Sequence, residues 1–297
     1  MIGLELHDTQ AFAVGVDDHG SVMARAQADA GGDLGAAAAK AVEQVQRSMA
    51  ATSPGLLGLA AINPESPAIV AVVSQLALRF GGLGKDGAVL SGTAAAAAEA
   101  WIGAARGVQE VVFFAVSQHT TGGVVRNGAA VTGARGRASS VAWLSLNPVE
   151  REDYRKTGCL EAEVAAAGIV RRLIWRIKAG DRSRVQEMVK DDFSAITVEH
   201  VLEAARNGDG VSISVVRDTA KYLGMAAANL VVISDPEMLV LGGIMATAAD
   251  LLLDPIRIEI SRRLPKPMMD ALRIETATLG TDAAGIGAAR LVAAALP

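Results

Sequence analysis

The sequence predicts an α/β fold, because apolar segments of strand length alternate with alanine-rich helical segments along most of the chain. The alternation occurs in two blocks of similar pattern, before and after about residue 115. A chain of 297 residues is long enough to form two domains of moderate size, and 51% hydrophobic residues can supply a sizeable core.

The first block opens with three short strands, expected at residues 1–6, 11–16 and 21–28, which is typical of a meander at the edge of a mixed sheet. An alanine-rich helix is expected at 34–49. The near-continuous apolar run at 55–62 predicts a strand buried on both faces. The pattern then predicts helices at 67–80 and 93–106, with Thr93 near the N-cap of the second, and strands at 87–92 and 110–117.

The second block opens with a loop and a hairpin, in the stretch AVSQHTTGGVVRNG. Asn127 and Gly128 predict a tight turn, because both residue types tolerate a positive φ. Pro255 either kinks its helix or marks the first turn. Apolar patterning predicts strands at 238–243 and 272–280, and helices at 160–178, 197–207, 211–232, 247–263 and 282–296.

Composition narrows the class of protein. The net charge of −4, with no dominant basic patch, argues against nucleic-acid and anionic-membrane partners. A modest basic cluster has helical spacing and predicts a solvated helix face: Arg171, Arg172, Arg176 and Lys178. Cys159 is the one cysteine of the sequence, so no internal disulfide can form. The N-terminus lacks the pattern of a signal peptide, and no apolar run is long enough to cross a bilayer. These features predict a soluble cytoplasmic protein.

Three segments carry a resemblance to a known family: EAWIGAARG, SDPEMLVLGGIMA and LGTDAAGIGAARLVAAAL. Their order and content resemble the ROK family of sugar kinases and sugar-responsive repressors. The resemblance implies a two-domain actin-like ATPase (ribonuclease H-like) fold with a ligand cleft between the domains. A small domain is expected at 1–115, completed by the helix at 283–297, and a large domain at 116–282. Homo-oligomers are implied by the resemblance alone. Family repressors carry an N-terminal helix-turn-helix, and this chain begins at its first expected strand.

The family binds phosphate with two glycine-rich loops. The first, Asp-x-Gly-Gly-Thr, falls on Glu5 to Thr9, where Thr9 is kept and His7 and Asp8 replace both glycines. Asp8 brings negative charge toward the expected phosphates. The second loop falls on residues 117–123. The residues that the resemblance assigns to the cofactor are Thr9, Gly122, Gly123, Gly242 and Gly243. The glycines after the 238–243 strand and the DAAGIG run have an alternative role in close packing. Binding of ATP with magnesium is therefore weakly supported.

The chemistry-bearing residues of the family are mostly replaced. Its Asn-Asp pair, in which the Asp is the general base, falls on Leu90 and Ser91. Ser91 either contacts sugar or is a turn residue. The family's sugar-binding Glu and zinc-binding His fall on Ser140 and Trp143, and Trp143 either stacks on a sugar or fills the volume of the missing zinc knuckle. Only one cysteine of the family's zinc set remains, so no zinc is predicted.

Glu161 matches a sugar-contacting glutamate of the family, so Ser91, Ser140 and Glu161 are the expected substrate-binding residues. His119 either contacts an anion or is polar surface. These replacements predict a sugar-kinase-like protein with an eroded active site, non-catalytic or weakly active, that binds a sugar or nucleotide or serves in regulation. The alternative is an active sugar kinase with a rearranged site, in which Glu5 or Asp8 holds the metal. A transcriptional repressor is the least favoured hypothesis.

Overall fold

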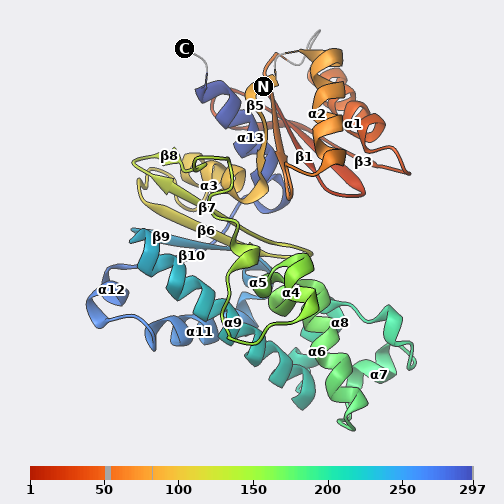
Figure 1. The fold of residues 1–297 in the computed structure, drawn as a ribbon, viewed down its shortest axis with the longest axis vertical. Helices are drawn as coiled ribbons and strands as arrows, with labels where there is room; N and C mark the ends of the chain where they lie inside the picture. Colours follow the sequence, from red (N-terminus) through yellow and green to blue (C-terminus); the bar gives the residue numbers. More distant parts are fainter. Residues whose placement is uncertain (51–54, 82, 296–297) are drawn as a thin grey trace. The chain divides into compact units, whose positions relative to one another are not determined.

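The computed structural model describes residues 1–50, 55–81 and 83–295, which form helices and two five-stranded sheets (Figure 1). The chain divides into two compact units. Unit 1 comprises Met1–Phe113, Gly122–Ser139 and Ala277–Pro297, and unit 2 comprises Phe114–Thr121 and Ser140–Thr276. The domain division expected at residue 115 stays a prediction, and residues 296–297 of its last helix lie outside the described residues.

The first sheet, in unit 1, has the strand order β3-β2-β1-β4-β5. Strands β1 and β2 pair antiparallel, as do β2 and β3, so the predicted meander at the edge is confirmed. Strands β4 and β5 extend the sheet in parallel with β1. The strand bounds are β1 (Ile2–Leu6), β2 (Gln10–Val16), β3 (Val22–Asp29), β4 (Leu57–Ala61) and β5 (Leu83–Leu90).

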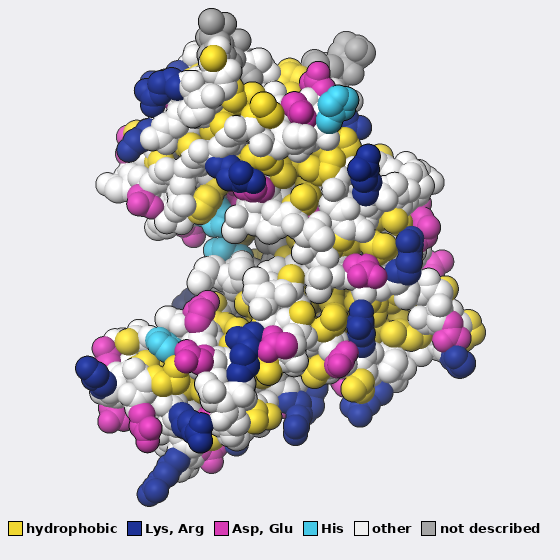
Figure 2. Space-filling model, turned by 180° about the vertical axis from the view of Figure 1, so that it is seen from behind, with side chains coloured by type: hydrophobic (Ala, Val, Ile, Leu, Met, Phe, Trp, Pro, Cys, Tyr) yellow, Lys and Arg dark blue, Asp and Glu magenta, His cyan; other side chains and the backbone are white. Residues whose placement is uncertain are grey.

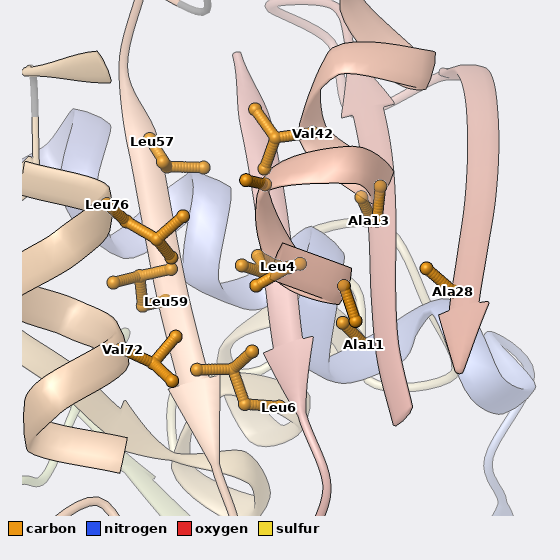
Figure 3. Packing of buried hydrophobic residues seen from close by; sticks show 14 of the residues in the cluster. Leu4, Leu6, Ala11, Ala13, Ala28, Val42, Leu57, Leu59, Val72 and Leu76 are labelled. Atoms are coloured by element: carbon orange, nitrogen blue, oxygen red, sulfur yellow. The ribbon is translucent and has the colours of Figure 1, made fainter. Parts of the chain in front are cut away.

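Two helices, α1 (Leu34–Ser48) and α2 (Pro67–Phe80), cover one face of this sheet. All residues of β1 and β4 are buried, as expected for parallel strands with both faces covered. Leucines at alternate positions of these strands point to the helices, because side chains alternate across a strand (Figure 3). The side chains of Asp33 and Ser66 accept backbone hydrogen bonds and cap α1 and α2.

The opposite face of the sheet is covered by α13 (Ala283–Ala294), which also packs against α3 (Ser91–Trp101). Backbones approach closely here. A Cβ at Gly3 would lie 1.7 Å from the carbonyl oxygen of Gly285, and a Cβ at Gly287 would lie 1.7 Å from that of Ala94. Only glycine fits at such contacts, so the DAAGIG run is explained by helix packing.

Glu99 joins the end of α3 to the segment that leads into α13. Its side chain is fully buried, and its carboxylate accepts hydrogen bonds from the backbone N–H groups of Ala104 (2.7 Å), Thr278 (3.0 Å) and Leu279 (3.0 Å). The hydroxyl of Thr278 donates a further bond at 3.3 Å. A buried carboxylate with this many donors has its desolvation offset locally.

The second sheet has the order β10-β9-β6-β7-β8, and β6 and β7 contribute residues to both units. The turn between β7 and β8 has φ values of 50° at Asn127 and 73° at Gly128, so the predicted hairpin is confirmed. The strand bounds are β6 (Val111–Val116), β7 (Thr120–Arg126), β8 (Ala129–Ala130), β9 (Met238–Gly243) and β10 (Arg273–Thr276).

Unit 2 is rich in helices, of which the longest is α9 (Gly210–Ser234). None of the helices in the described part of the chain is long and apolar enough to cross a membrane. The other helices of unit 2 are α4 (Glu152–Thr157), α5 (Cys159–Val164), α6 (Ala166–Lys178), α7 (Arg184–Met188), α8 (Val198–Arg206), α10 (Ile244–Thr247), α11 (Ala249–Ser261) and α12 (Lys266–Ala271).

Several predicted boundaries are wrong. The strand expected at 87–92 ends at Leu90, which is the N-cap of α3 in place of Thr93, so Ser91 and Gly92 are helical. The helix expected at 160–178 is interrupted at Ala165, whose backbone is extended. Pro255 lies in the interior of α11, and the last strand, β10, is shorter than the 272–280 segment.

Candidate functional site

The turn between β1 and β2 holds the residues of the first expected phosphate loop. The N–H of His7 donates to the carbonyl oxygen of Gln10 at 2.9 Å, and Asp8 and Thr9 form the exposed tip. Glu5, only 9% exposed, has Oε1 at 3.3 Å from Nε2 of His7. The loop is therefore a tight turn with ordinary side chains, and its tip carries a carboxylate.

A cavity of about 600 Å³ lies in unit 1 beside this turn, next to the first turns of α1 and α2. Two carboxylates and three neutral polar side chains line it, together with glycines and apolar groups. The polar lining residues are Asp8, Thr9, Asp33, Ser66 and Gln75. Thr9, one of the residues assigned to the cofactor, thus borders a space that can hold a small molecule.

Ser91 lies at the first position of α3, so its interpretation as a turn residue is wrong. It is 4% exposed, and its Oγ has no hydrogen-bond partner among the residues that the structure describes. The last residues of the three parallel strands are in register, with Leu6 paired to Ala61 and Ala61 to Leu90. Ser91 therefore begins at the carboxyl edge of the sheet, where open α/β sheets bind their ligands.

The retained glycines at 122–123 pack against the beginning of α3. A Cβ at Gly92 would lie 2.2 Å from the carbonyl oxygen of Gly122, and a Cβ at Gly123 would lie 2.2 Å from that of Gly92. In unit 2, Gly243 has a φ of 61°, and a Cβ there would lie 1.9 Å from the carbonyl oxygen of Val116. Gly242 is buried in β9. Packing alone therefore requires glycine at positions 123 and 243, whether or not a ligand binds there.

Within unit 2, Glu161 of α5 binds residues 119–120, where the loop after β6 enters β7. The N–H of Thr120 donates to Oε2 of Glu161 at 2.8 Å, and Nδ1 of His119 lies 3.2 Å from Oε1. The N–H of Ala166 donates to the carbonyl oxygen of Ser117 at 3.0 Å. This bond gives a partner to the first N–H of α6, which the helix break at Ala165 leaves without one inside the helix. Both carboxylate oxygens of Glu161 are occupied within unit 2.

A second buried carboxylate, Glu163, lies at the centre of a charged network that the sequence analysis missed. Glu163 is 7% exposed and accepts hydrogen bonds from Arg151 (3.0 Å), Tyr154 (2.5 Å) and Arg172 (2.9 Å). Burial lowers the pKa of Arg151, but its ion pair with Asp153 outweighs that effect and raises it. The predicted solvated face is wrong for Arg172, which is 16% exposed at its side chain.

This network occupies the segment where the family's zinc set was expected. Arg151 pairs with Asp153 through Nη2 and Oδ2 at 2.7 Å, and Arg171 reaches the same oxygen at 2.6 Å. Cys159 begins α5 and is partly buried. Within residues 1–50, 55–81 and 83–295, no group of three His, Cys, Asp or Glu side chains is placed to hold a metal ion. The expectation of a chain without zinc stays a prediction.

Ser140 and Trp143 lie at a short 3₁₀ helix, Val141–Trp143, in unit 2. Trp143 is 56% exposed, so the hypothesis that it fills an interior volume is wrong. An exposed indole ring is available to stack on a ligand. Ser140 is exposed, and its assignment to the substrate stays a prediction.

Comparison with known proteins identifies relatives of two kinds. A glucokinase of Halalkalibacterium halodurans is 33% identical over 200 residues, which is 67% of this chain and 60% of the glucokinase. An N-acetylglucosamine repressor of Escherichia coli O6:H1 is 28% identical over 68% of this chain and 48% of the repressor. The match thus spans about half to three fifths of the length of these relatives.

Solved structures share the fold over nearly the whole chain. A ROK family glucokinase from Streptomyces griseus, in complex with glucose and AMPPNP, has a TM-score of 0.81 at 22% identity, and the match covers 98% of both chains. A ROK hexokinase from Thermus thermophilus has a TM-score of 0.76 at 25% identity, over 98% of this chain and 97% of the hexokinase. The predicted α/β fold of the actin-like ATPase class is confirmed. The model of the ROK family matches residues 92–295, more than half of the sequence. This chain belongs to the ROK family.

Proposed function

We propose that this protein binds a sugar or a nucleotide and transfers phosphate very slowly or not at all. The observation that carries the proposal is Ser91, which stands at the start of α3, where the family resemblance expects the general base. A serine hydroxyl cannot take up a proton at neutral pH as a carboxylate does. Loss of a positioned general base typically costs about 10²- to 10⁴-fold in rate.

Two further features of the chain support the proposal. The N–H of Thr120 is bonded to Glu161, so a phosphate at the second loop would have to displace that bond. Asp8 places a negative charge at the tip of the first loop, where it repels phosphate unless a cation intervenes. Each feature weakens binding of a triphosphate in the geometry of an efficient kinase.

A coupled assay of ADP release tests the proposal. Purified chain is incubated with magnesium-ATP and a panel of hexoses and amino sugars, and we expect turnover indistinguishable from the sugar-free blank. The double variant Leu90→Asn/Ser91→Asp installs the family's Asn-Asp pair, and we expect it to gain about 100-fold over any residual rate. Robust sugar-dependent turnover that Ser91→Ala or Glu161→Ala abolishes would show that the proposal is wrong.

An active kinase with a rearranged site is the second candidate function. The relatives named glucokinase favour it, and Glu5 beside His7 offers a carboxylate near the first turn. Titration calorimetry with magnesium-ATP at millimolar concentration separates the two candidates, because every active kinase must bind its nucleotide. Absence of any heat of binding removes the active kinase.

DNA binding is the third candidate, because some relatives are named repressors. On the face shown in Figure 2, dark blue Lys and Arg side chains are interspersed with magenta Asp and Glu side chains. A net charge of −4 gives little attraction to a polyanion. A gel-shift experiment at moderate salt tests this candidate, and we expect no retarded band.

A further inference from the structure

The free edge of β3 fits the same edge of a second copy of this chain. We infer that two copies pair through this strand, antiparallel, so that their two five-stranded sheets become continuous. β3 is the outermost strand of the first sheet, and in the described part of the chain it pairs with β2 alone (Figure 1). An outermost strand presents a row of backbone N–H and C=O groups to any strand that can add to it.

The hydrogen-bond ladder between β2 and β3 decides which residues present these groups. Directly after β3, the N–H of Ala30 donates to the carbonyl oxygen of Thr9 at 2.8 Å. Hydrogen-bonded and non-hydrogen-bonded pairs alternate along an antiparallel ladder, so the even-numbered residues of β3 bond to β2. The backbone groups of the odd-numbered residues therefore point to the free edge: Met23, Arg25, Gln27 and Asp29.

This edge lacks the features that usually prevent pairing. Protected edge strands carry lysine, proline or a bulge, and β3 contains neither lysine nor proline. The register shift in its ladder lies between Gly15 and Val16, opposite the beginning of β3, and leaves residues 24–29 regular. The even-numbered side chains at 24, 26 and 28 are alanines that pack toward the core under α1. No bulky side chain on that face therefore hinders an added strand.

Charge complementarity selects a second copy as the added strand and fixes its register. Arg25 and Asp29 are exposed on the same face of β3. When Gln27 of one copy lies opposite Gln27 of the other, Arg25 of each copy lies opposite Asp29 of the other. All these pairs join outward-facing residues, so each exchanges two N–H···O bonds, and opposite charges directly across a ladder are stabilising. Registers centred on Arg25 or on Asp29 place like charges opposite each other and are disfavoured.

Both charged side chains can keep their present bonds in such a dimer. The side chain of Arg25 is 62% exposed, and its Nε donates to Oδ2 of Asp282 at 2.7 Å. A guanidinium has five N–H donors, so it can bind a second carboxylate. Oδ1 of Asp29 accepts from the amide of Gln10 at 2.8 Å, and a carboxylate can accept further bonds. Pairing therefore adds contacts at this edge without breaking those inside the chain.

Sedimentation velocity of the full chain tests the pairing. We expect a reversible dimer between about 1 and 200 μM, because an interface of one strand pair is small. Asp29→Arg puts arginines opposite each other, and Arg25→Asp puts carboxylates opposite each other. Each variant alone should weaken the dimer roughly tenfold or more. An equimolar mixture of the two variants restores both opposite-charge pairs, so we expect dimers to return in the mixture.

Two further variants separate the strand edge from other causes. Asp282→Asn is the matched control, because it removes the partner of Arg25 inside the chain and leaves the edge unchanged, so it should dimerise like the unmodified protein. Gln27→Pro removes the outward N–H at the centre of the pairing without changing any charge. Edge strands tolerate proline where the N–H faces solvent, so this variant should fold and should weaken the dimer roughly tenfold or more. Circular dichroism checks the fold of every variant.

The outcomes decide for or against pairing through β3. Dimers that are lost in both charge variants and return in their mixture support it. A chain that stays monomeric up to about 200 μM overturns it, and the edge is then open to an extended segment of another protein. Dimers that persist in both Asp29→Arg and Gln27→Pro form through another surface and also overturn it. If Arg25→Asp fails to fold, those two variants decide alone.

Discussion

Replacement of Glu99 by glutamine tests whether a buried carboxylate holds unit 1 together. The two oxygens of Glu99 together hold the segment after α3 to the segment before α13. Oε1 accepts from the N–H groups of Thr278 and Leu279, while Oε2 accepts from the N–H of Ala104 and the hydroxyl of Thr278. Glutamine keeps one oxygen and puts an amide NH₂ in the place of the other. With the NH₂ in the place of Oε2, the backbone N–H of Ala104 faces another donor and loses its hydrogen bond.

The size of the effect follows from these contacts. A hydrogen bond to a charged group contributes about 1.5–3 kcal/mol, and a buried donor left without a partner costs about 1–3 kcal/mol. The hydroxyl of Thr278 can rotate to accept from the new NH₂, so that contact is kept. We expect Glu99→Gln to lower the free energy of unfolding by about 2–4 kcal/mol. For a domain of this size, that lowers Tm by roughly 5–15 °C.

Urea denaturation followed by circular dichroism measures this change, with thermal unfolding as the second readout. Glu65→Gln is the matched control, since Glu65 is half-exposed and pairs with an exposed arginine, Arg137. An exposed ion pair contributes only about 0–1 kcal/mol, so this control should unfold close to the native chain. If the two variants unfold at the same urea concentration, Glu99 does not stabilise the joint.

The remaining predictions concern unit 2 and the helix contacts. Burial raises the pKa of Asp209, but hydrogen bonds from the backbone and from Ser183 outweigh it and hold the pKa below 3.8. The contribution of Asp209 to the free energy of unfolding is therefore fully present above pH ~3.8, and it is lost as the pH falls through the lowered pKa. Between pH 6 and pH 2.5, the urea midpoint of Asp209→Asn should fall less steeply than that of the unmodified protein, because the variant lacks this titrating carboxylate. Gly287→Ala should destabilise unit 1 by roughly 3 kcal/mol or more, because its Cβ would meet the backbone of Ala94. Gly210→Ala, with open space around it, should change stability by less than about 1 kcal/mol in the same denaturation experiment.

The elements that the sequence predicts correctly are those with local causes. The turn at Asn127 and Gly128 is specified by two residues that adopt a positive φ, and β4 is specified by a near-continuous apolar run. The break at Ala165 has no such signal. The N–H that the break frees, that of Ala166, donates to the carbonyl oxygen of Ser117, a residue 49 positions earlier, and a contact at that separation leaves no local pattern.

The site was harder to predict than the fold. The resemblance put Ser91 at the position of the general base, but the burial of its side chain depends on how α3 packs, which no local pattern shows. The network around Glu163 draws on arginines 12 residues before it and 9 residues after it, a spacing that gives no periodic signal. One clue was available for Glu99, because a charged residue inside an alanine-rich, apolar helix must find partners when it is buried.

Glycines that survive in this chain do not by themselves indicate a surviving nucleotide site. A Cβ at Gly123, Gly243 or Gly287 would overlap with backbone oxygens of the same unit, so each is required by packing whether or not a ligand binds. Substitutions at these positions would destabilise the fold and abolish any activity together. The residues that separate an active kinase from a binding protein are therefore those that packing leaves free to vary. Ser91 is the best of these, because its hydroxyl makes no hydrogen bond within the described part of the chain and occupies the position expected for the base. Ser91→Ala should therefore cost little stability, so a change of activity or binding in that variant can be attributed to the site.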